Sequence, residues 1–480
     1  MLQQLKQERV FAHFFEICRY PHPSHHEQEL SCYLYDWAKK LGLEVYQDEA
    51  WNLIIKKPAS PGYETHPTVL LQAHIDMVCQ KEEHVQHDFL RDPIPVQVDG
   101  DWISTGNKTT LGADNGIGVA YIMAVLEDQS LKHPPIEAVL TTAEEDDFSG
   151  AIAVDGSLLH AKHIINLDFA EEDAILCGSS GGNGCEITLP VVWEKPDATL
   201  SWYDISLKGL PGGHSGEDIH RGRGSAATLM TEILQHLYET MEKIQLAGLR
   251  CGNFRLAIPR DGEILVGVAH PEQLQTIVAR LEQDYQAQYH KVAPSLTLSM
   301  EEATSPLQVV HEETLEKILC LLHLCPNGMF QMNSQMPHVV ESSDNLGEVR
   351  LEEQVLRLVF EIRATYQSSQ TFLNRALEYA AKSVGAECRT FHYYPSWHYR
   401  EELPLLEKAK ELYKAKFGEN PSTVVFHAGL ETGYFLEKLP QAQAIAMGPT
   451  AHYFHAPGEK LSISSTRRMY QFLVALLAEL

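Results

Sequence analysis

Strand and helix patterns alternate at both ends of this chain but not in its middle, and this arrangement restricts the possible folds most. Short apolar runs typical of buried strands lie at residues 52–56, 69–73, 136–142, 163–167, 423–426 and 442–447. Helical patterns accompany them at residues 116–126, 403–417 and 464–480. This alternation predicts a three-layer α/β domain, in which helices cover both faces of a mainly parallel sheet.

The middle of the chain has a different pattern. Two strand-rich stretches at 185–193 and 200–207 precede helical patterns at residues 224–247, 271–289, 306–324 and 369–384. We therefore expect an α/β domain made of residues 1–185 and 389–480, interrupted by an inserted α+β domain of residues 186–388.

The N-terminal part predicts two further helices, one within the first 20 residues and one at residues 27–41. Ser24 is followed three residues later by Glu27, which is the spacing of a capping box. We expect these two side chains to start the second helix.

An excess of acidic side chains limits the partners that this chain can bind. Its 480 residues include 38 basic and 65 acidic side chains, which give a formal charge of −27. Nucleic acids and anionic membrane surfaces both require a basic contact surface. We therefore expect neither as a partner.

Cysteine usage and hydropathy indicate a cytoplasmic protein. The nine cysteines are scattered and contain no Cys-x-x-Cys pair, which fits a reducing compartment. No stretch approaches the ~18 apolar residues of a membrane span, and the charged N-terminal segment does not resemble a secretory signal. Any metal is expected on His, Asp and Glu side chains.

The end of one predicted strand carries a possible metal-binding pair. Residues 69–73 are followed by His74-Ile-Asp76, and alternate residues of a strand point to the same side. Ligands of open α/β sheets bind at the carboxyl ends of the strands, and a metal-bound histidine usually donates its second N–H to a carboxylate. The alternative is an ordinary surface histidine and aspartate beside a turn.

Other predicted element ends carry the same kinds of side chain. Asp114 precedes a predicted helix, where it could also be a simple N-cap. Four adjacent acids, residues 144–147, follow one predicted strand, and Asp168 follows another. A C-terminal loop brings His455 and Glu459. Adjacent acids repel one another unless a cation balances them, and oxygen and imidazole donors suit Zn²⁺, Co²⁺ or Mn²⁺. The recurrence predicts a metal site.

Several sequence strings together resemble the M20 family of dinuclear zinc peptidases. The resemblance runs over most of the chain in the strings HIDMV, LGADNGIGVA, TTAEE, NLD, LPGGHSG and GPTAHYFHAPGE. Within the family, the large insertion and the strings GGHSGEDIHRGRGSA and HAGLE resemble the aminoacyl-histidine (Xaa-His) dipeptidases.

The resemblance implies a site that holds two divalent ions, zinc with Co²⁺ or Mn²⁺ as alternatives. Asp114 would bridge them, His74 and Asp168 would complete one ligand set, and Glu145 and His455 the other. A cis peptide after Asp114 is also implied.

The resemblance also implies the other roles at the site. Glu144 would be the general base, and Asp76 would orient His74. In the inserted domain, which would serve as a lid, His214 would contact the reacting carbonyl of the substrate. Arg363 would hold a substrate carboxylate, and Asn345 would contact the substrate.

The activity that this resemblance implies is hydrolysis of a small peptide, a dipeptide with C-terminal histidine such as carnosine, by a monomer or homodimer. A tripeptidase, a carboxypeptidase and an N-acyl amino acid deacylase of the same fold are alternatives. A metal-binding scaffold without catalysis is a further one.

Three details stay open in the sequence. The C-terminal loop reads HAPGE where the family more often has HSPDE, so His452 competes with His455. The acidic run continues beyond Glu145, so the base and the ligand could each shift by one residue. His427 and Glu431, one helical turn apart, either line the site or are buried structural residues.

Two other patterns favour ordinary roles. Residues 178–182 match Gly-x-Ser-x-Gly around Ser180, but the sequence after them predicts a strand, whereas the serine hydrolase motif needs a helix. The histidines near the N-terminal end, including His25, and the pair His84 and His87 are expected to be solvated.

Overall fold

The computed structural model describes residues 2–400 and 402–480, and the chain forms two compact units. The first unit contains the residues up to Gly178, Trp397–Val425 and Leu430–Leu480. The second contains Ser179–Ser396 and Phe426–Gly429. The boundaries expected at residues 185 and 389 lie inside two strands, β9 (Gly181–Pro190) and β21 (Glu387–Tyr394). These strands pair with each other, and both belong to the second unit.

The first unit is built on an eight-stranded sheet with a parallel centre. β6, β3, β7 and β23 run parallel, and antiparallel strands flank them. In sheet order the strands are β1 (Glu44–Gln47), β2 (Leu53–Lys57), β6 (Ile136–Thr141), β3 (Val69–His74), β7 (His163–Asn166), β23 (Gln443–Ala446), β8 (Ala174–Ser179) and β22 (Ser422–Phe426). Every residue of β3 and β6 is buried, as expected for strands covered on both faces.

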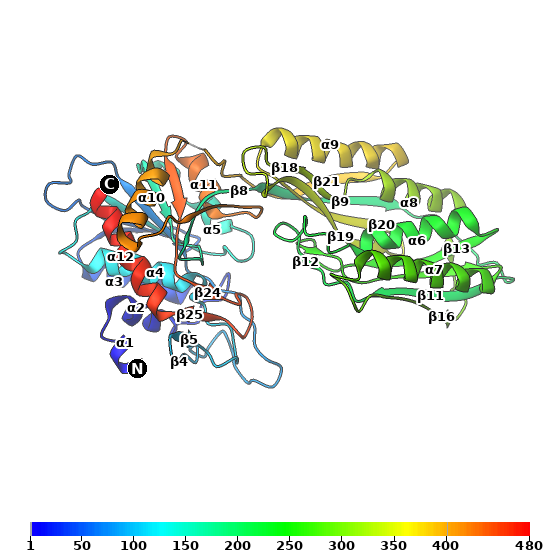
Figure 1. The fold of residues 1–480 in the computed structure, drawn as a ribbon, viewed down its shortest axis with the longest axis horizontal. Coiled ribbons are helices and arrows are strands. Elements are labelled where there is room, and N and C mark those ends of the chain that lie inside the picture. Colours follow the sequence, from blue (N-terminus) through cyan, green and yellow to red (C-terminus); the bar gives the residue numbers. More distant parts are fainter. Residues whose placement is uncertain (1, 401) are drawn as a thin grey trace. The chain divides into compact units, whose positions relative to one another are not determined.

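Helices cover this sheet (Figure 1). The helices of this unit are α1 (Leu2–Leu5), α2 (Arg9–Ile17), α3 (Gln28–Lys40), α4 (Ala113–Glu127), α5 (Ser149–Ala153), the 3₁₀ turn Gly156–Leu158, α10 (Pro404–Phe417), α11 (Glu431–Lys438) and α12 (Ile463–Glu479). α4 packs on β3 and α2 and is buried from Asn115 to Leu126, so it is apolar all round. A small sheet joins β4 (Gln97–Asp99), β5 (Trp102–Ser104), β25 (Lys460–Ser462) and β24 (Ala451–His452).

The predicted capping box is wrong. α3 begins at Gln28, but the Ser24 hydroxyl donates to Asp76 Oδ2 at 2.8 Å, and the Glu27 carboxylate accepts the Ala143 N–H at 2.9 Å. Both side chains therefore serve the loops that follow β3 and β6. These long-range partners replace the local ones that the spacing indicates.

The second unit is an α+β domain on a nine-stranded antiparallel sheet (Figure 1). In sheet order its strands are β16 (Thr297–Ala303), β11 (Ser201–Lys208), β15 (Gly262–Val268), β13 (Ile244–Cys251), β19 (Val340–Leu351), β20 (Val355–Ala364), β9 (Gly181–Pro190) and β21 (Glu387–Tyr394), with β18 (Gly328–Met332) also on β19. Its helices are α6 (Ala226–Thr240), α7 (Pro271–Tyr289), α8 (Glu312–Leu324) and α9 (Gln367–Val384). The second unit also contains two short strand pairs. One joins β10 (Trp193–Glu194) to β17 (Val309–Val310), and the other joins β12 (Gly213–His214) to β14 (Ala257–Ile258).

Two helices of this unit are shorter than predicted. The pattern at 224–247 contains α6 only to Thr240, because Met241 is extended and Ile244 already begins β13. The pattern at 306–324 contains β17 before α8 begins at Glu312. In both places one apolar run spans two elements, and short apolar runs fit a helix or a strand equally well.

Among the described residues, no helix combines the length and the apolar character that crossing a membrane requires.

Candidate metal centre

Three strands of the parallel centre bring candidate ligands to one edge of the sheet. β3 pairs with β6 and β7 in parallel, so their carboxyl ends lie together. β3 ends at His74, and Asp168 lies two residues after β7. His74 Nε2 lies 3.1 Å from Asp114 Oδ1 and 3.7 Å from Asp168 Oδ1.

A second group of ligands lies on the other side of Asp114. His455 Nε2 is 3.4 Å from Asp114 Oδ2 and 2.9 Å from Glu145 Oε1. Asp114 therefore directs one carboxylate oxygen toward His74 and the other toward His455. Potential ligand atoms lie within 4.8 Å of one another in each of three groups: His74, Asp114 and Asp168; Asp114, Glu145 and His455; His74, Glu144 and Glu145.

The electrostatics of this cluster fit bound cations. Burial raises the pKa of Glu144 well above its usual value, with Asp168 and Glu145 adding to the effect. Burial and the nearby Asp114 raise the pKa of Glu145 to about 7, and the same two causes raise that of Asp168. Acids crowded in a desolvated place favour positive charge between them, which divalent ions supply.

The two histidines take up part of this negative charge. Burial opposes protonation of His455, but hydrogen bonds to Asp114 and Glu145 raise its pKa to about 10. Burial likewise opposes protonation of His74, but Asp168 and Asp114 raise its pKa well above its usual value. In return, the two histidines lower the pKa of Asp114 against the effect of its own burial.

Asp76 holds both His74 and the acidic loop. Its Oδ1 lies 3.2 Å from His74 Nδ1 and accepts the Glu144 N–H at 3.1 Å. Its Oδ2 accepts the Glu145 N–H at 3.1 Å and the Ser24 hydroxyl. A carboxylate on Nδ1 keeps the proton there and leaves Nε2 available as a ligand atom.

Glu459 holds the start of α4, a role that sequence reasoning missed. Its carboxylate accepts the N–H groups of four consecutive residues, 111–114, at 2.6–3.3 Å. The implied cis peptide between Asp114 and Asn115 is present. Glu459 ends the HAPGE string, so its place beside His455 was the available signal.

The structure favours His455 over His452 as a ligand. His452 lies on β24, and the centroid of its ring lies 5.3 Å from that of Trp102. His455 faces Asp114 and Glu145, as described above.

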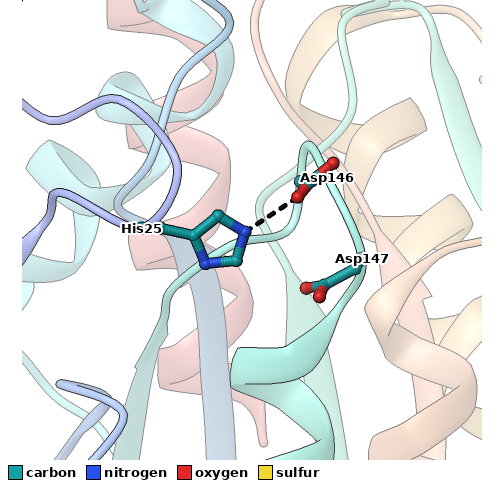
Figure 2. A group of neighbouring side chains, drawn as sticks. All are labelled: His25, Asp146 and Asp147. Atoms are coloured by element: carbon teal, nitrogen blue, oxygen red, sulfur yellow. Dashed lines mark hydrogen bonds and ion pairs between the residues drawn. The ribbon is translucent and has the colours of Figure 1, made fainter.

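The structure also favours Glu144 and Glu145 over their neighbours. Figure 2 shows His25 directed at Asp146, with Nε2 2.8 Å from Oδ2, and Asp147 beside them. Asp147 Oδ1 accepts the Ser149 N–H at the start of α5. His25 is exposed, as expected, but it has a carboxylate partner.

The second unit contains the three candidate substrate-binding residues. His214 Nδ1 accepts the N–H groups of Gly216 and Glu217 at 3.2 and 3.1 Å. Arg363, on β20, is buried and donates to Ser215 Oγ and to the Tyr394 hydroxyl.

Asn345, the third of them, is engaged with the backbone. Its Nδ2 donates to the carbonyls of Arg255 and Ala257 at 2.8 and 2.9 Å. Its Oδ1 is buried without a hydrogen-bond partner among the residues that the structure describes.

The HAGLE string divides between the two units. His427 belongs to the second, where its Nε2 lies 2.7 Å from Ser343 Oγ and its backbone N–H donates to Glu217. Glu431 belongs to the first, where Gln72 and Thr141 donate to its carboxylate. The two residues therefore have separate surroundings.

The sequence of this chain matches the model of a known protein family. A model of peptidase family M20/M25/M40 matches residues 70–479. The chain belongs to this family.

Two relatives of this M20 chain match it over its full length. It is 34% identical to the cytosol non-specific dipeptidase of Escherichia coli (strain K12) over 481 residues, which cover 100% of this chain and 99% of the relative. The crystal structure of aminoacylhistidine dipeptidase from Vibrio alginolyticus matches with a TM-score of 0.89 and 34% identity, covering 100% of this chain and 98% of that one. Aminopeptidase PepT from Bacillus cereus, at 17% identity and a TM-score of 0.53 over 98% of both chains, shares the fold.

Membership of the M20 family identifies the chain as a metal-dependent peptide-bond hydrolase. The serine hydrolase alternative finds no support in the geometry, because β9 begins at Gly181, directly after Ser180, where that motif requires a helix.

Proposed function

We propose that this M20 hydrolase cleaves dipeptides, with a preference for Xaa-His, at a centre that holds two divalent ions. The observation that carries the proposal is the position of Asp114, whose two carboxylate oxygens face His74 on one side and His455 on the other. A carboxylate with separate partners on its two oxygens is suited to bridge two ions.

The nitrogen and oxygen donors around Asp114 divide into two sets, each suited to one divalent ion. His74 and Asp168 would hold one ion and Glu145 with His455 the other, each set sharing Asp114. Nitrogen and oxygen donors fit Zn²⁺, and Co²⁺ or Mn²⁺ are alternatives. Such ions, when bound, would supply Lewis-acid chemistry that polarises the scissile carbonyl and lowers the pKa of the attacking water.

Glu144 is the proposed general base. It lies in one group with His74 and Glu145, and burial raises its pKa. A carboxylate of raised pKa can accept the proton of the attacking water and return it to the leaving amine. Asp76 contributes by fixing the Glu144 backbone and the His74 ring.

The second unit supplies the proposed substrate contacts and serves as a lid. His214 would donate a hydrogen bond to the oxygen of the reacting carbonyl, where negative charge develops. Arg363 would bind the C-terminal carboxylate of the substrate, and Asn345 Oδ1 is the amide atom left to accept a substrate hydrogen bond. The Arg363 side chain is held in place by Ser215 and Tyr394.

The names of the two relatives support dipeptides as the substrates of this chain. They leave the identity of the second residue of the dipeptide open. One is described as non-specific and the other as an aminoacylhistidine dipeptidase, and both are 34% identical to this chain.

The free thiols of all nine cysteines and the word "cytosol" in one name support a cytoplasmic location. We propose a monomer or homodimer.

A substrate panel tests the proposal. We expect the highest kcat/KM for Xaa-His dipeptides, including β-alanyl-histidine, over other dipeptides, tripeptides and N-acyl amino acids. Activity should disappear on chelation and return with Zn²⁺, Co²⁺ or Mn²⁺. Higher kcat/KM for tripeptides or N-acyl amino acids would contradict the dipeptidase assignment, and equal values for all dipeptides would contradict only the histidine preference.

A further inference from the structure

Each of the three strands that lead to the metal centre carries a buried polar side chain at or near its carboxyl end. Gln72 on β3 precedes His74 by two residues, and Asn166 on β7 precedes Asp168 by two. Thr141 on β6 precedes Glu144 by three. All three side chains are fully buried, in strands that are otherwise mostly apolar. A buried polar group costs free energy unless it is hydrogen-bonded, so their partners matter.

These side chains meet at Glu431, the first residue of α11. Its Oε2 accepts the Thr141 hydroxyl at 2.7 Å and the Gln72 amide at 2.5 Å. Gln72 Oε1 in turn accepts from Asn166 Nδ2, and Asn166 Oδ1 accepts the Asp168 N–H at 3.1 Å. One hydrogen-bonded chain therefore joins Glu431 to all three strands.

Glu431 itself is buried, with 1% of its surface exposed. Its other oxygen, Oε1, has no hydrogen-bond partner among the residues that the structure describes. Thr141 and Gln72 are neutral donors, so among the described residues this carboxyl accepts hydrogen bonds from neutral groups only. A buried acid in such surroundings lowers stability relative to an apolar residue of similar size, which argues for a role beyond packing.

The network joins neighbouring strands side by side. β3 lies between β6 and β7, and the network links all three just before the residues that turn toward the metal centre. A shift of one strand against another would move His74, Glu144 or Asp168 out of reach of the others. Groups behind the ligands commonly set ligand orientation and metal affinity.

We propose that Glu431 is a positioning residue of the metal centre, which fixes β3, β6 and β7 so that their terminal ligands converge. This inference rests on the proposed function, because it takes these ligands to bind divalent ions. Glu431 acts through Gln72, Thr141 and Asn166.

The test measures ion binding rather than turnover. Apo-protein is titrated with Co²⁺ against a chromophoric chelator, and the visible spectrum of bound Co²⁺ reports the ligand geometry. Glu431→Ala should weaken Co²⁺ binding by about 10- to 100-fold and change the spectrum. Glu431→Gln retains an oxygen that can accept from Thr141 and Gln72, so it should restore most of the affinity.

Glu137→Ala is the matched control. Glu137 is a buried carboxylate at the opposite end of β6, where it accepts the N–H groups of His160 and Ala161. Its loss should destabilise the fold but leave the affinity and the spectrum unchanged. If Glu431→Ala lowers stability as Glu137→Ala does and binds Co²⁺ like the wild type, the positioning role is refuted.

A second variant covers the case in which Glu431→Ala does not fold. Gln72→Leu keeps the Glu431 carboxyl but cuts its link to Asn166, and it should also weaken Co²⁺ binding, by about 10-fold. Wild-type affinity and spectrum in this variant would refute the proposal. Wild-type protein that binds no Co²⁺ at the centre would instead refute the proposed function.

Discussion

Glu144 and Asp146 stand two residues apart in one acidic run, yet their surroundings give them different chemistry. The Glu144 carboxyl lies in one group with the buried His74, and burial raises its pKa, whereas Asp146 is exposed and paired with His25. The sequence alone does not distinguish the acids of such a run, because the difference arises from contacts with distant segments.

Replacing Glu144 by Gln should therefore remove turnover without removing the ions. We expect kcat to fall by about 10²- to 10⁴-fold, the usual contribution of a general base, while the metal content per chain stays at the wild-type value. Steady-state kinetics with metal analysis of the same samples checks this.

Asp146→Asn is the matched control and should keep nearly full activity. A large loss of kcat in Asp146→Asn together with normal turnover in Glu144→Gln would show that the base is displaced along the acidic run.

His427 provides a pH-dependent prediction. Burial, with Arg363 and His214 nearby, lowers its pKa well below the ordinary value of 6.5, so the folded protein keeps it neutral. Below pH 6.5 the unfolded chain binds a proton that the folded chain does not, so this residue makes stability fall as pH falls. Stability from this source is fully present above pH 6.5.

We expect the melting temperature of the wild type to drop more between pH 7.5 and 5.5 than that of His427→Gln, which lacks the titrating group. Thermal melts of both proteins at matched ionic strength check this. A parallel pH dependence in the two proteins would contradict a neutral buried His427.

The types of candidate ligand could be identified at the residue scale, but the side chains that hold them in place could not. His74 and Asp168 are recognisable because they follow apolar strands, and carboxyl ends of strands gather at one edge. Ser24, Glu27 and Glu459 are held by partners between 52 and 348 residues away. No local spacing reports such contacts, which is why Ser24 and Glu27 suggested a capping box.

At the scale of elements, the start of α4 depends on one carboxylate from the other end of the chain. Gly112, the residue before this helix, has a left-handed backbone with φ of 70°, and its N–H is one of the four that Glu459 accepts. Removing the carboxylate would leave those buried donors unpaired and release Asp114 from its position.

We therefore expect Glu459→Ala to lower the free energy of unfolding by at least about 2 kcal/mol, since one unsatisfied buried donor costs about 1–3 kcal/mol. Denaturant unfolding of the apo-protein measures this. Ser462→Ala, which removes the side-chain cap of α12, is the comparison and should cost about 1 kcal/mol. A smaller loss for Glu459→Ala than for Ser462→Ala would contradict the role given to Glu459.

Strong periodicity predicted the elements well, and ambiguous apolar runs did not. The strand at 69–73 corresponds to β3 and the pattern at 271–289 to α7. The run at 224–247 joined α6 to the first residues of β13, because Ile244 and Leu246 continue an apolar series that only pairing with β15 defines as a strand.

At the scale of the whole molecule, the return of the first pattern near the C-terminal end was sufficient to predict a discontinuous domain. The exact boundaries of that domain could not be predicted from the sequence, because they depend on the pairing of β9 with β21 inside the second unit. Only this pairing places the division near Gly178 and Trp397.

The net charge of −27 is also a property of the whole molecule. Four of its carboxylates, Asp114, Glu144, Glu145 and Asp168, lie at the candidate metal centre, where the two proposed divalent ions would offset them.

The number of divalent ions bound per chain tests the central claim most directly. Titration of metal-free protein, followed by metal analysis of the washed complex, should give two ions per chain in the wild type. Asp114→Asn should lose tight binding of both, because Asp114 belongs to both ligand sets. A fully active wild type with one ion per chain, or an Asp114→Asn variant that binds two ions as tightly as the wild type, would contradict the two-ion centre.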